Sequence, residues 1–398
     1  MTTDLTTQPE GVYDLLDGAF YAADPHAAWA WMREHQPVYR DERNDVWALT
    51  RYADVLAASR DPDTFSNAGG IRPHGGGLPM MIEMDDPDHL RRRKLVNRGF
   101  TPRQVRDRET RIREVCDSLI DAVAAEGRCD FVWDLAAPLP LIVIGDMLGM
   151  PEERHADLLE WSDALVGATT STDESAAVRA AAAMEAFREF QMGVIADRRR
   201  SPGDDLVSVL VHAEVDGSAL DDEELLYESL LILIGGDETT RHVISGGMYE
   251  LMTRPDQRQK LLDDPSRLDV AVEEMLRWVT PIKNMNRTVT RDVEIGGERL
   301  GEGDQVLLFY PSANRDETVF DRPFDFDVER RPNEHLAFGF GAHFCLGANL
   351  ARLELRVMFE RLLERLPDMA LADDEPLPVR PANFISGFES MPVEFSPA

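Results

Sequence analysis

The residue with the clearest chemical character is Cys345, which lies in the stretch F-G-F-G-A-H-F-C-L-G at residues 338–347. Its neighbours include Gly339, Gly341 and Gly347, and glycines let a backbone turn tightly or approach another group closely. A thiolate is a soft, charged ligand that suits iron, and backbone N–H groups aimed at the sulfur tune it. The pattern therefore indicates a loop built around a metal-binding cysteine rather than a cysteine that only fills a core.

The complete pattern F-G-x-G-x-H-x-C-x-G favours haem iron as that metal. A thiolate ligand pushes electron density toward the iron and promotes cleavage of the O–O bond of bound dioxygen. A helix expected from Gly347 to Leu366 adds the positive end of its dipole. We expect Phe338 and Phe344 to cover the pocket of the sulfur, and His343 to reach a haem propionate.

Two other interpretations fit parts of this stretch. The first is a glycine-rich turn around a buried cysteine, and the second is a zinc site formed by His335, His343 and Cys345. The zinc site lacks a fourth ligand at the usual spacing and gives the glycines no role. Haem ligation is therefore the preferred hypothesis.

A second chemical stretch, L-L-I-L-I-G-G-D-E-T-T-R-H at residues 230–242, lies inside a long helical pattern. The acidic run at 221–224 predicts its start, and the pattern continues to about Met252, a helix of roughly 48 Å. Two glycines and two threonines weaken its middle, and a threonine hydroxyl that bonds the i−4 carbonyl bends a helix. A widened turn there would set Glu238 beside Thr239, the acid and alcohol that a proton relay requires. The alternative is a packed helix whose glycines allow close contact with a neighbour.

A third stretch, E-E-M-L-R-W, places Glu274 and Arg277 at i and i+3 on one helix face. An isolated pair of this kind is usually a solvated surface contact worth less than ~0.5 kcal/mol. A second arginine, Arg330, stands 15 residues before Cys345. Together the three charged residues predict a buried structural lock beneath the cysteine loop.

A fourth stretch, D-H-L-R-R-R-K-L-V-N-R-G-F at residues 88–100, is basic in a strongly acidic chain. His89 and Arg93 are at i and i+4, so both are expected to bind haem propionates, with Arg287 as a further candidate. The other bases form one cluster: Arg91, Arg92, Lys94 and Arg98. This cluster is either a solvated face or a dock for an acidic electron-transfer protein.

The composition bounds the class of protein that carries these motifs. The chain has 398 residues, is 43% hydrophobic and has a net charge of −32, which permits a sizeable core and disfavours nucleic acid and anionic membranes as partners. The segment Met1–Glu10 is polar, and no run of 18 apolar residues occurs, so no transmembrane segment is expected. Cys116 and Cys129 are interpreted as ordinary small hydrophobes, and the odd cysteine count favours a reducing, cytoplasmic location.

The order of predicted elements indicates a mainly α protein with small peripheral β-sheets in a single domain, residues 1–398, because alternating βαβ units are absent. Predicted helices cover Pro25–His35, Tyr52–Ala58, Pro102–Ala125, Ala176–Arg200 and Asp256–Asp264, and predicted strands cover Val46–Leu49, Val289–Ile295, Gln305–Phe309 and a segment near the C-terminus. The Gly- and Pro-rich segment 66–87 is predicted to be a lid or binding loop, or a loop folded onto the core.

Taken together, the four stretches resemble the cytochrome P450 superfamily of haem-thiolate monooxygenases in its soluble bacterial form, over essentially the whole chain. The resemblance implies the triangular, mostly α P450 fold with one haem b. It also implies roles for the motif residues: Cys345 as axial ligand, Thr239 with Glu238 as proton-delivery pair, Glu274, Arg277 and Arg330 as lock, and Phe338, Gly339, His343, Gly347, His89, Arg93 and Arg287 around the haem. The distal motif begins with Gly235 where alanine is common in the family, and its acid is Glu238 where aspartate is commoner.

Several longer stretches, such as L-P-M-M-I-E-M-D-D-P-D-H-L-R-R-R-K-L-V-N-R-G-F-T, resemble actinobacterial steroid hydroxylases. That resemblance implies oxidation of the terminal methyl of the cholesterol or cholest-4-en-3-one side chain to the alcohol, and onward to aldehyde and acid. By position, the substrate wall would be formed by Ile71, Leu78, Met80, Met81, Leu231, Ile234, Gly235, Ile282, Met285, Phe384 and Ile385. These residues are apolar, which fits a large neutral lipid.

No ferredoxin or reductase segment is recognised in the 398 residues, so electrons are expected from a separate ferredoxin and an NAD(P)H-dependent ferredoxin reductase, with dioxygen as co-substrate. Alternatives within the fold are a fatty acid, terpene or macrolide substrate, and direct use of hydrogen peroxide. A haem-binding sensor or carrier is the alternative of a different class. A sensor has no need of Glu238 and Thr239, and peroxygenases usually lack such a pair.

Overall fold

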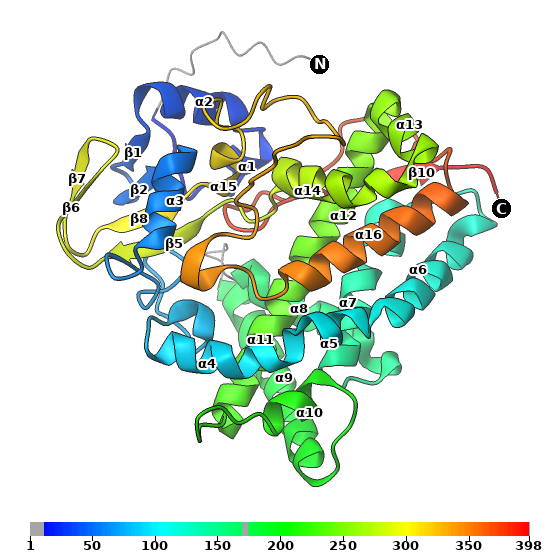
Figure 1. The fold of residues 1–398 in the computed structure, drawn as a ribbon, viewed down its shortest axis with the longest axis horizontal. Coiled ribbons are helices and arrows are strands. Elements are labelled where there is room, and N and C mark those ends of the chain that lie inside the picture. Colours follow the sequence, from blue (N-terminus) through cyan, green and yellow to red (C-terminus); the bar gives the residue numbers. More distant parts are fainter. Residues whose placement is uncertain (1–11, 169–173, 398) are drawn as a thin grey trace.

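The computed structural model describes residues 12–168 and 174–397, and the predicted polar segment 1–10 lies outside the described residues. Most strands gather on one side of the molecule, β10 lies on the other side among the helices, and the outline narrows toward α10 (Figure 1). Within the described ranges, no helix is long and apolar enough to cross a membrane.

The sheet side of the molecule holds a five-stranded sheet in the order β1-β2-β8-β5-β3, in which β2 and β8 are parallel and the other pairs antiparallel. Its members and the short elements beside it are α1 (Gly18–Ala22), α2 (His26–His35), β1 (Val38–Asp41), β2 (Val46–Leu49), α3 (Tyr52–Arg60), β3 (Phe65–Ser66), β5 (Met285–Val289), β8 (Gln305–Leu308) and α15 (Tyr310–Ala313). Two smaller sheets consist of β4 (Arg128–Asp130), β10 (Pro392–Glu394) and β9 (Ala370–Leu371), and of β6 (Val293–Ile295) and β7 (Glu298–Leu300).

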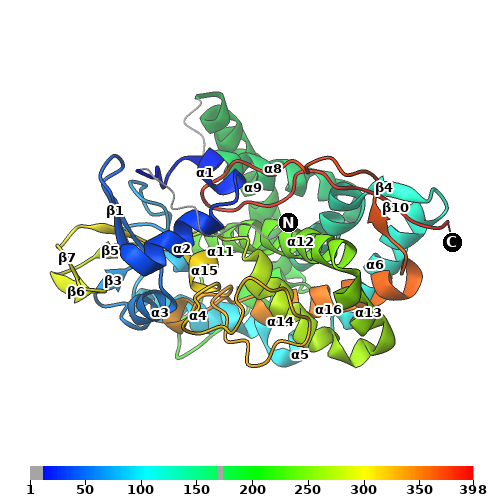
Figure 2. The ribbon, with the colours of Figure 1, turned by 90° about the horizontal axis from the view of Figure 1, so that it is seen from above.

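The helical side accounts for most of the large apolar core. Its helices are α4 (Asp88–Val96), α5 (Pro102–Arg106), α6 (Glu109–Ala124), α7 (Pro138–Met147), α8 (His155–Ala168), α9 (Glu174–Arg200), α10 (Leu206–Val211), α11 (Asp222–Gly236), α12 (Glu238–Thr253), α13 (Pro255–Asp263), α14 (Leu268–Val279) and α16 (Ala348–Arg365). In both views α12 and α16 lie near the middle of this part, and the two helices contact each other (Figure 2). The cysteine loop leads directly into α16.

The predicted long helix over residues 221–252 is two helices, and this prediction was wrong in that respect. Asp221 caps α11 through a capping box with Glu224, as the acidic first turn predicts. The helix then breaks at Asp237, whose ψ is −72°. Thr239 Oγ1 donates to the carbonyl of Gly235 at 2.9 Å, so the break occurs where the glycines and the threonine weaken the helix.

Two other element boundaries differ from prediction. The predicted helix over 102–125 ends at Arg106 and resumes as α6, because the run Arg106–Glu109 offers no apolar side chain to the core. The predicted strand over 289–295 is the end of β5 and all of β6. Residues 290–292 separate them, and the Thr290 hydroxyl donates to the carbonyl of Asp63 at 2.6 Å. The other predicted helices and strands are present within two residues of their predicted ends, and Cys116 is buried in α6 as expected.

Candidate haem-thiolate active site

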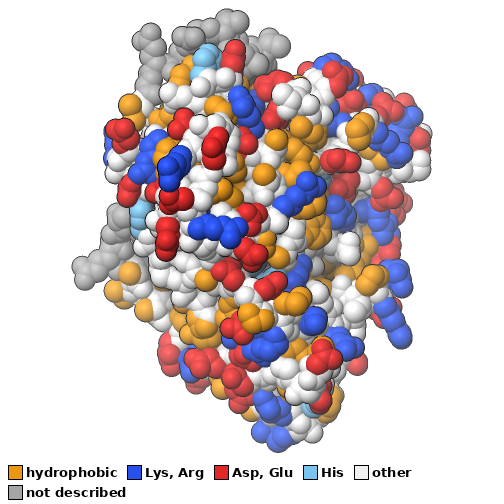
Figure 3. Space-filling view, turned by 60° about the vertical axis from the view of Figure 1, so that its left-hand side comes forward, with side chains coloured by type: hydrophobic (Ala, Val, Ile, Leu, Met, Phe, Trp, Pro, Cys, Tyr) orange, Lys and Arg blue, Asp and Glu red, His pale blue; other side chains and the backbone are white. Residues whose placement is uncertain are grey.

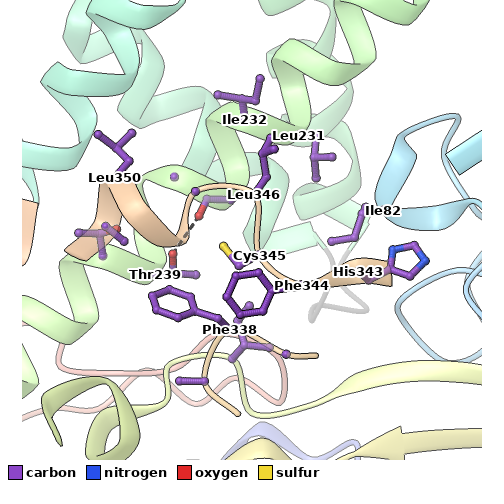
Figure 4. A pocket seen from close by; sticks show the side chains of 18 of the residues that line it. Ile82, Leu231, Ile232, Thr239, Phe338, His343, Phe344, Cys345, Leu346 and Leu350 are labelled. Carbon is purple, nitrogen blue, oxygen red and sulfur yellow. Dashed lines mark hydrogen bonds between the residues drawn. The ribbon is translucent and has the colours of Figure 1, made fainter. Parts of the chain in front are cut away.

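An apolar cavity of about 220 Å³ lies between the cysteine loop and α16 on one side and α11 and α12 on the other. Cys345 lines it, and its sulfur is drawn toward α11 (Figure 4). The eight residues predicted to hold the cofactor all line this one cavity: Cys345, His89, Arg93, Arg287, His343, Phe338, Gly339 and Gly347. The sequence therefore predicted correctly that segments 250 residues apart would meet here.

The cysteine loop needs glycine at two positions. Gly339 and Gly341 have φ values of +67° and +76°, in the left-handed region that side chains disfavour. A Cβ on Gly341 would also lie 2.4 Å from the carbonyl oxygen of Ser59 in α3. The loop is closed by a hydrogen bond from the N–H of Cys345 to the carbonyl of Phe338 at 2.9 Å.

Burial raises the pKa of the Cys345 thiol above its usual value. The N–H groups of Gly347 and Ala348 and the guanidinium of Arg93 oppose this effect, as a loop built to carry a thiolate requires. Because burial wins, the sulfur needs a further positive charge to ionise at neutral pH. A metal cation on the sulfur supplies that charge, since a coordinating thiol is deprotonated outright.

Four nitrogen-bearing side chains gather at one end of the cavity without matching acids. His89 and His343 have ring centroids 4.1 Å apart, and Arg93 and Arg287 lie beside them. Among the described residues only His89 has a carboxylate within ion-pair distance, Asp86 at 3.1 Å, and its buried Nε2 has no partner. Burial, with these neighbouring cations, lowers the pKa of His343 to about 2. Such an end fits an anion with two acidic groups, as the propionates of haem provide.

The zinc alternative does not fit the structure. The Nε2 of His335 lies 3.1 Å from Glu273 Oε2, while His343 lies against His89. In the described part of the chain, no group of three or more His, Cys, Asp or Glu side chains is placed to hold a metal ion. The cavity therefore fits a haem, whose iron needs one protein sulfur, better than a bare metal ion.

On the opposite wall, the two glycines at the helix break have different roles. A Cβ on Gly236 would lie 2.4 Å from Ile144 Cδ1 in α7, so this glycine allows close helix packing, as the alternative interpretation held. Gly235 has open space where a Cβ would be and lines the cavity. Thr239 also lines the cavity, with its hydroxyl bonded to the Gly235 carbonyl (Figure 4).

Glu238 is adjacent to Thr239 in sequence, but its side chain does not line the cavity. It is fully buried and binds Arg380 Nη1 at 2.5 Å and Arg241 Nη2 at 3.0 Å. Burial raises the pKa of Glu238, and the two arginines oppose that rise. The prediction that the Glu238 carboxyl lies beside the Thr239 hydroxyl is thus corrected, because the carboxyl lies against arginines and the hydroxyl lies at the cavity. Sequence reasoning missed Arg380 because nothing local links residues 142 positions apart.

The Thr239→Ala substitution is expected to leave cofactor binding unchanged while diverting reducing equivalents into hydrogen peroxide. Alanine removes the hydroxyl that donates to the Gly235 carbonyl and with it a proton donor on that wall. Peroxide formed per NAD(P)H consumed is the measurement, with Thr253→Ala, an exposed threonine in the same helix, as the control. Unchanged coupling in Thr239→Ala would mean that protons arrive by another route.

A buried carboxyl that sequence reasoning missed, Glu354 in α16, also lines the cavity and is 2% exposed. No hydrogen-bond partner for it is found among the described residues. Burial, and then the negative charge of Asp237, raise the pKa of Glu354 to about 8, while Arg108 opposes them. Glu354 is therefore uncharged at neutral pH. The nine-residue spacing between Cys345 and Glu354 in the sequence did not indicate that Glu354 would be buried at the cavity.

We expect Glu354→Gln to stabilise the folded protein increasingly as the pH rises from about 5 to 8. The pKa rises from 4.5 in the unfolded chain to about 8 in the folded protein, so the folded state loses stability as pH rises through this window. Glutamine removes that loss, a gain of roughly 2–4 kcal/mol at pH 8. Urea unfolding of both proteins at pH 5 and pH 8 measures it. An equal free-energy difference at the two pH values would contradict the prediction.

The three residues predicted to form the lock contact one another and are buried. Glu274 accepts from Arg277 Nε and Nη2, both at 2.7 Å, and from Arg330 Nε at 3.1 Å. Arg277 also donates to the carbonyls of Asn314 at 2.8 Å and Pro323 at 2.9 Å. Because the side chains of Glu274 and Arg277 are 0% exposed, the surface-pair alternative is excluded. The lock joins α14 to the segment that precedes the cysteine loop.

A second ion pair, which sequence reasoning missed, ties the same helix to α16. Glu273 binds Arg352 Nε at 2.6 Å and Nη2 at 2.8 Å, and accepts from His335. These contacts overcome partial burial and lower the pKa of Glu273 to about 2. The guanidinium of Arg352 in turn lies 4.6 Å from the centroid of the Phe338 ring. The two adjacent glutamates thus fix opposite ends of the loop that carries the cysteine.

The structure brings five of the residues predicted for the substrate wall to the cavity. Met81, Leu231, Gly235, Ile282 and Met285 line the cavity. The others do not line it directly: Ile71, Ile234, Phe384 and Ile385 form an apolar cluster with Ile282 and Met285, and Met80 is buried in the main core. Leu78 does not line the cavity and is 47% exposed.

The predicted basic cluster is also smaller than expected. Arg92 is buried and pairs with Glu228, and Arg91 pairs with Glu224. Both arginine side chains are therefore directed toward α11. Arg93 donates to the carbonyl of Phe344 at the cavity. Acidic and basic side chains are interspersed on the sheet side of the molecule (Figure 3). The interpretation of all four bases as one solvated face is therefore wrong.

These features together define a haem-thiolate protein. The cavity holds one cysteine, has a basic end, and is bordered by a helix break that carries the Thr239 hydroxyl, all within a mainly α fold. A profile of the family described as cytochrome P450 matches residues 172–384. The chain shares 57% identity over 389 residues with a steroid C26-monooxygenase of Mycobacterium tuberculosis (97% of each chain). It shares 54% over 399 residues with one of Mycolicibacterium smegmatis (100% of this chain and 98% of that one). The chain is a haem-dependent monooxygenase of the cytochrome P450 family.

Solved structures agree with the predicted fold class. CYP109E1 from Bacillus megaterium in complex with testosterone superposes with a TM-score of 0.87 at 33% identity, covering 94% of this chain and 99% of that one. CYP109Q5 from Chondromyces apiculatus gives 0.88 at 35% identity, covering 97% and 98%. A more distant curated relative, a methyl-branched lipid omega-hydroxylase of Mycobacterium bovis, is 39% identical over 398 residues (96% of this chain and 92% of that one).

Proposed function

We propose that this protein hydroxylates the terminal methyl of a sterol side chain, with cholest-4-en-3-one or cholesterol as substrate, and that repeated turnover carries the alcohol to the aldehyde and acid. The observation that carries the proposal is the 57% identity to a steroid C26-monooxygenase over 97% of both chains. The apolar lining of the cavity, with Met81, Ile82 and Leu231 opposite the cysteine loop, supports a large neutral lipid.

We assign haem binding to the residues around the cavity, in a single domain. Cys345 would hold the iron, while His89, Arg93, Arg287 and His343 would bind the propionates. A thiolate-bound haem iron supplies the cleavage of dioxygen and the oxidation of an unactivated C–H bond. The apolar lining residues exclude water and hold the side chain of the sterol end-on. The Thr239 hydroxyl holds a proton at the cavity wall.

Glu238 is assigned as the source of that proton, although its carboxyl lies against Arg380. For proton transfer, either the side chain must leave the arginine or a water must bridge it to the Thr239 hydroxyl. The raised pKa of Glu238 favours the protonated form that such a transfer needs. Electrons are assigned to a separate ferredoxin and an NAD(P)H-dependent ferredoxin reductase, and the three unpaired cysteines favour the cytoplasm as location.

The test compares cholest-4-en-3-one with a methyl-branched fatty acid. The second substrate represents the alternative favoured by the 39% identity to a methyl-branched lipid omega-hydroxylase. A sterol that shifts the ferric Soret band to shorter wavelength and yields a terminal alcohol supports the proposal. A shift and product only with the fatty acid would replace the sterol by that alternative. Binding of either without product would favour a sensor or carrier.

A further inference from the structure

The roof of the cavity is a loop whose own hydrogen bonds centre on Glu83, which accepts the N–H groups of Ile71 and Leu78. Met81 and Ile82 line the cavity from a short 3₁₀ turn, Met81–Glu83. The preceding residues, Gly75, Gly76 and Gly77, are exposed, so their backbone conformations are weakly restricted. None of these internal contacts involves the N–H of Met81, which is 4% exposed and is held by an anchor outside the loop.

That external anchor is Glu228 in α11. Its Oε1 accepts the N–H of Met81 at 2.9 Å and Arg92 Nη1 at 2.9 Å. Arg92 Nη1 also donates to the carbonyl of Pro79 at 2.5 Å. The two side chains thus grip the loop on both sides of Met80 and join three segments: α4, the loop and α11. We call Glu228 and Arg92 the roof clasp.

Burying the ionisable side chains of the roof clasp costs desolvation free energy, which argues that the pair does more than fill space in the core. Glu228 is 0% exposed, its Oε2 has no hydrogen-bond partner in the part of the chain that the structure describes, and burial raises its pKa against the pull of Arg92. An uncharged acceptor would tie a loop down at less desolvation cost. A charged carboxylate holds both donors in one geometry, since charge-assisted hydrogen bonds are shorter and stronger than neutral ones.

The position of Glu228 links the roof to the wall. Leu231 and Ile232, which line the cavity, follow it at i+3 and i+4, so they lie on the same face of α11. One helical turn therefore sets both the wall and the height of the roof above it. Asn67 supports the same turn by donating to the carbonyl of Ile82 at 2.8 Å.

We propose that the roof clasp is a positioning pair that determines where the substrate is oxidised. By fixing the position of Met81, the roof clasp limits the lateral movement of the substrate side chain in the cavity. Oxidation is therefore directed to the terminal methyl rather than to the neighbouring methylenes. The identity of the product in this proposal rests on the proposed function. The anchoring of the loop by the roof clasp does not depend on the proposed function.

The test uses the haem-loaded enzyme and three variants of Glu228. Glu228→Asp keeps the charge but is one methylene too short to reach both donors, and Glu228→Ala removes the acceptor. We expect exchange of the Met81 amide hydrogen to rise about tenfold or more in both, with in-chain alcohols formed beside the terminal one. Glu228→Gln keeps the length and an acceptor oxygen, so most of the protection and of the product ratio should return.

Glu223→Gln is the matched control. Glu223 is an exposed acid in the first turn of α11 and is not part of the roof clasp. The exchange of the Met81 amide and the products of this variant should match those of the wild type. If Glu228→Ala does not fold, the Asp and Gln variants decide the question.

The proposal is overturned if Glu228→Asp keeps wild-type exchange at Met81, or if exchange rises while the product ratio stays unchanged. The second result would leave a merely structural role. Hydrogen exchange needs no substrate, so failure of the sterol assignment would show only in the product assay with wild-type enzyme.

Discussion

Replacing Cys345 by alanine is expected to abolish monooxygenase activity completely. The described residues offer no other thiol at this cavity, because Cys116 is buried in α6 and Cys129 lies in β4. Alanine keeps the hydrogen bond from the backbone of residue 345 to Phe338, so the loop should stay closed. The loss therefore reflects the ligand and not the fold.

Turnover, haem content and the position of the Soret band measure this loss. We expect less haem to be retained, and any retained haem to show no thiolate spectrum. Cys129→Ala is the control and should keep both spectrum and turnover, since its thiol lies outside the cavity. Measurable turnover with a thiolate spectrum in Cys345→Ala would refute the assignment of the ligand.

The second large effect is expected from Glu274→Ala, through stability. This substitution leaves Arg277 and Arg330 buried without their carboxylate, and it also removes the acceptor of the N–H of Asp327. Removing one partner of a buried ion pair costs roughly 3–5 kcal/mol. Because the lock holds the segment before the cysteine loop, we expect poor haem retention together with a lower unfolding midpoint.

Chemical unfolding of Glu274→Ala against Asp269→Ala measures the effect of the lock. Asp269 is an exposed acid on the same helix, so its removal should cost no more than about 1 kcal/mol. Should both variants unfold at the same denaturant concentration, the buried triad would not be a lock.

Local patterns in the sequence sufficed wherever a function depends on neighbouring residues. The glycines of the cysteine loop are needed at Gly339 and Gly341 because the backbone there is left-handed. The i, i+4 spacing of His89 and Arg93 places both on the cavity side of α4. The helix break beside Thr239 follows from two glycines and a hydroxyl that competes for a backbone carbonyl.

Features that depend on partners distant in the chain were out of reach. The direction of Glu238 is set by Arg380, and that of Arg92 by Glu228, 136 residues away. A single sequence shows that such charges exist but not which of them meet. Exposure of Leu78 and burial of Glu354 are equally non-local, because each depends on what packs around the residue rather than on its neighbours in sequence.

The most direct test of the central claim is the carbon monoxide difference spectrum of the reduced, purified protein. If Cys345 ligates haem iron as a thiolate in this cavity, the Soret band of the carbon monoxide complex will be strongly red-shifted. Well-folded, haem-loaded protein that shows only the unshifted band of a haem without a thiolate ligand would contradict the claim.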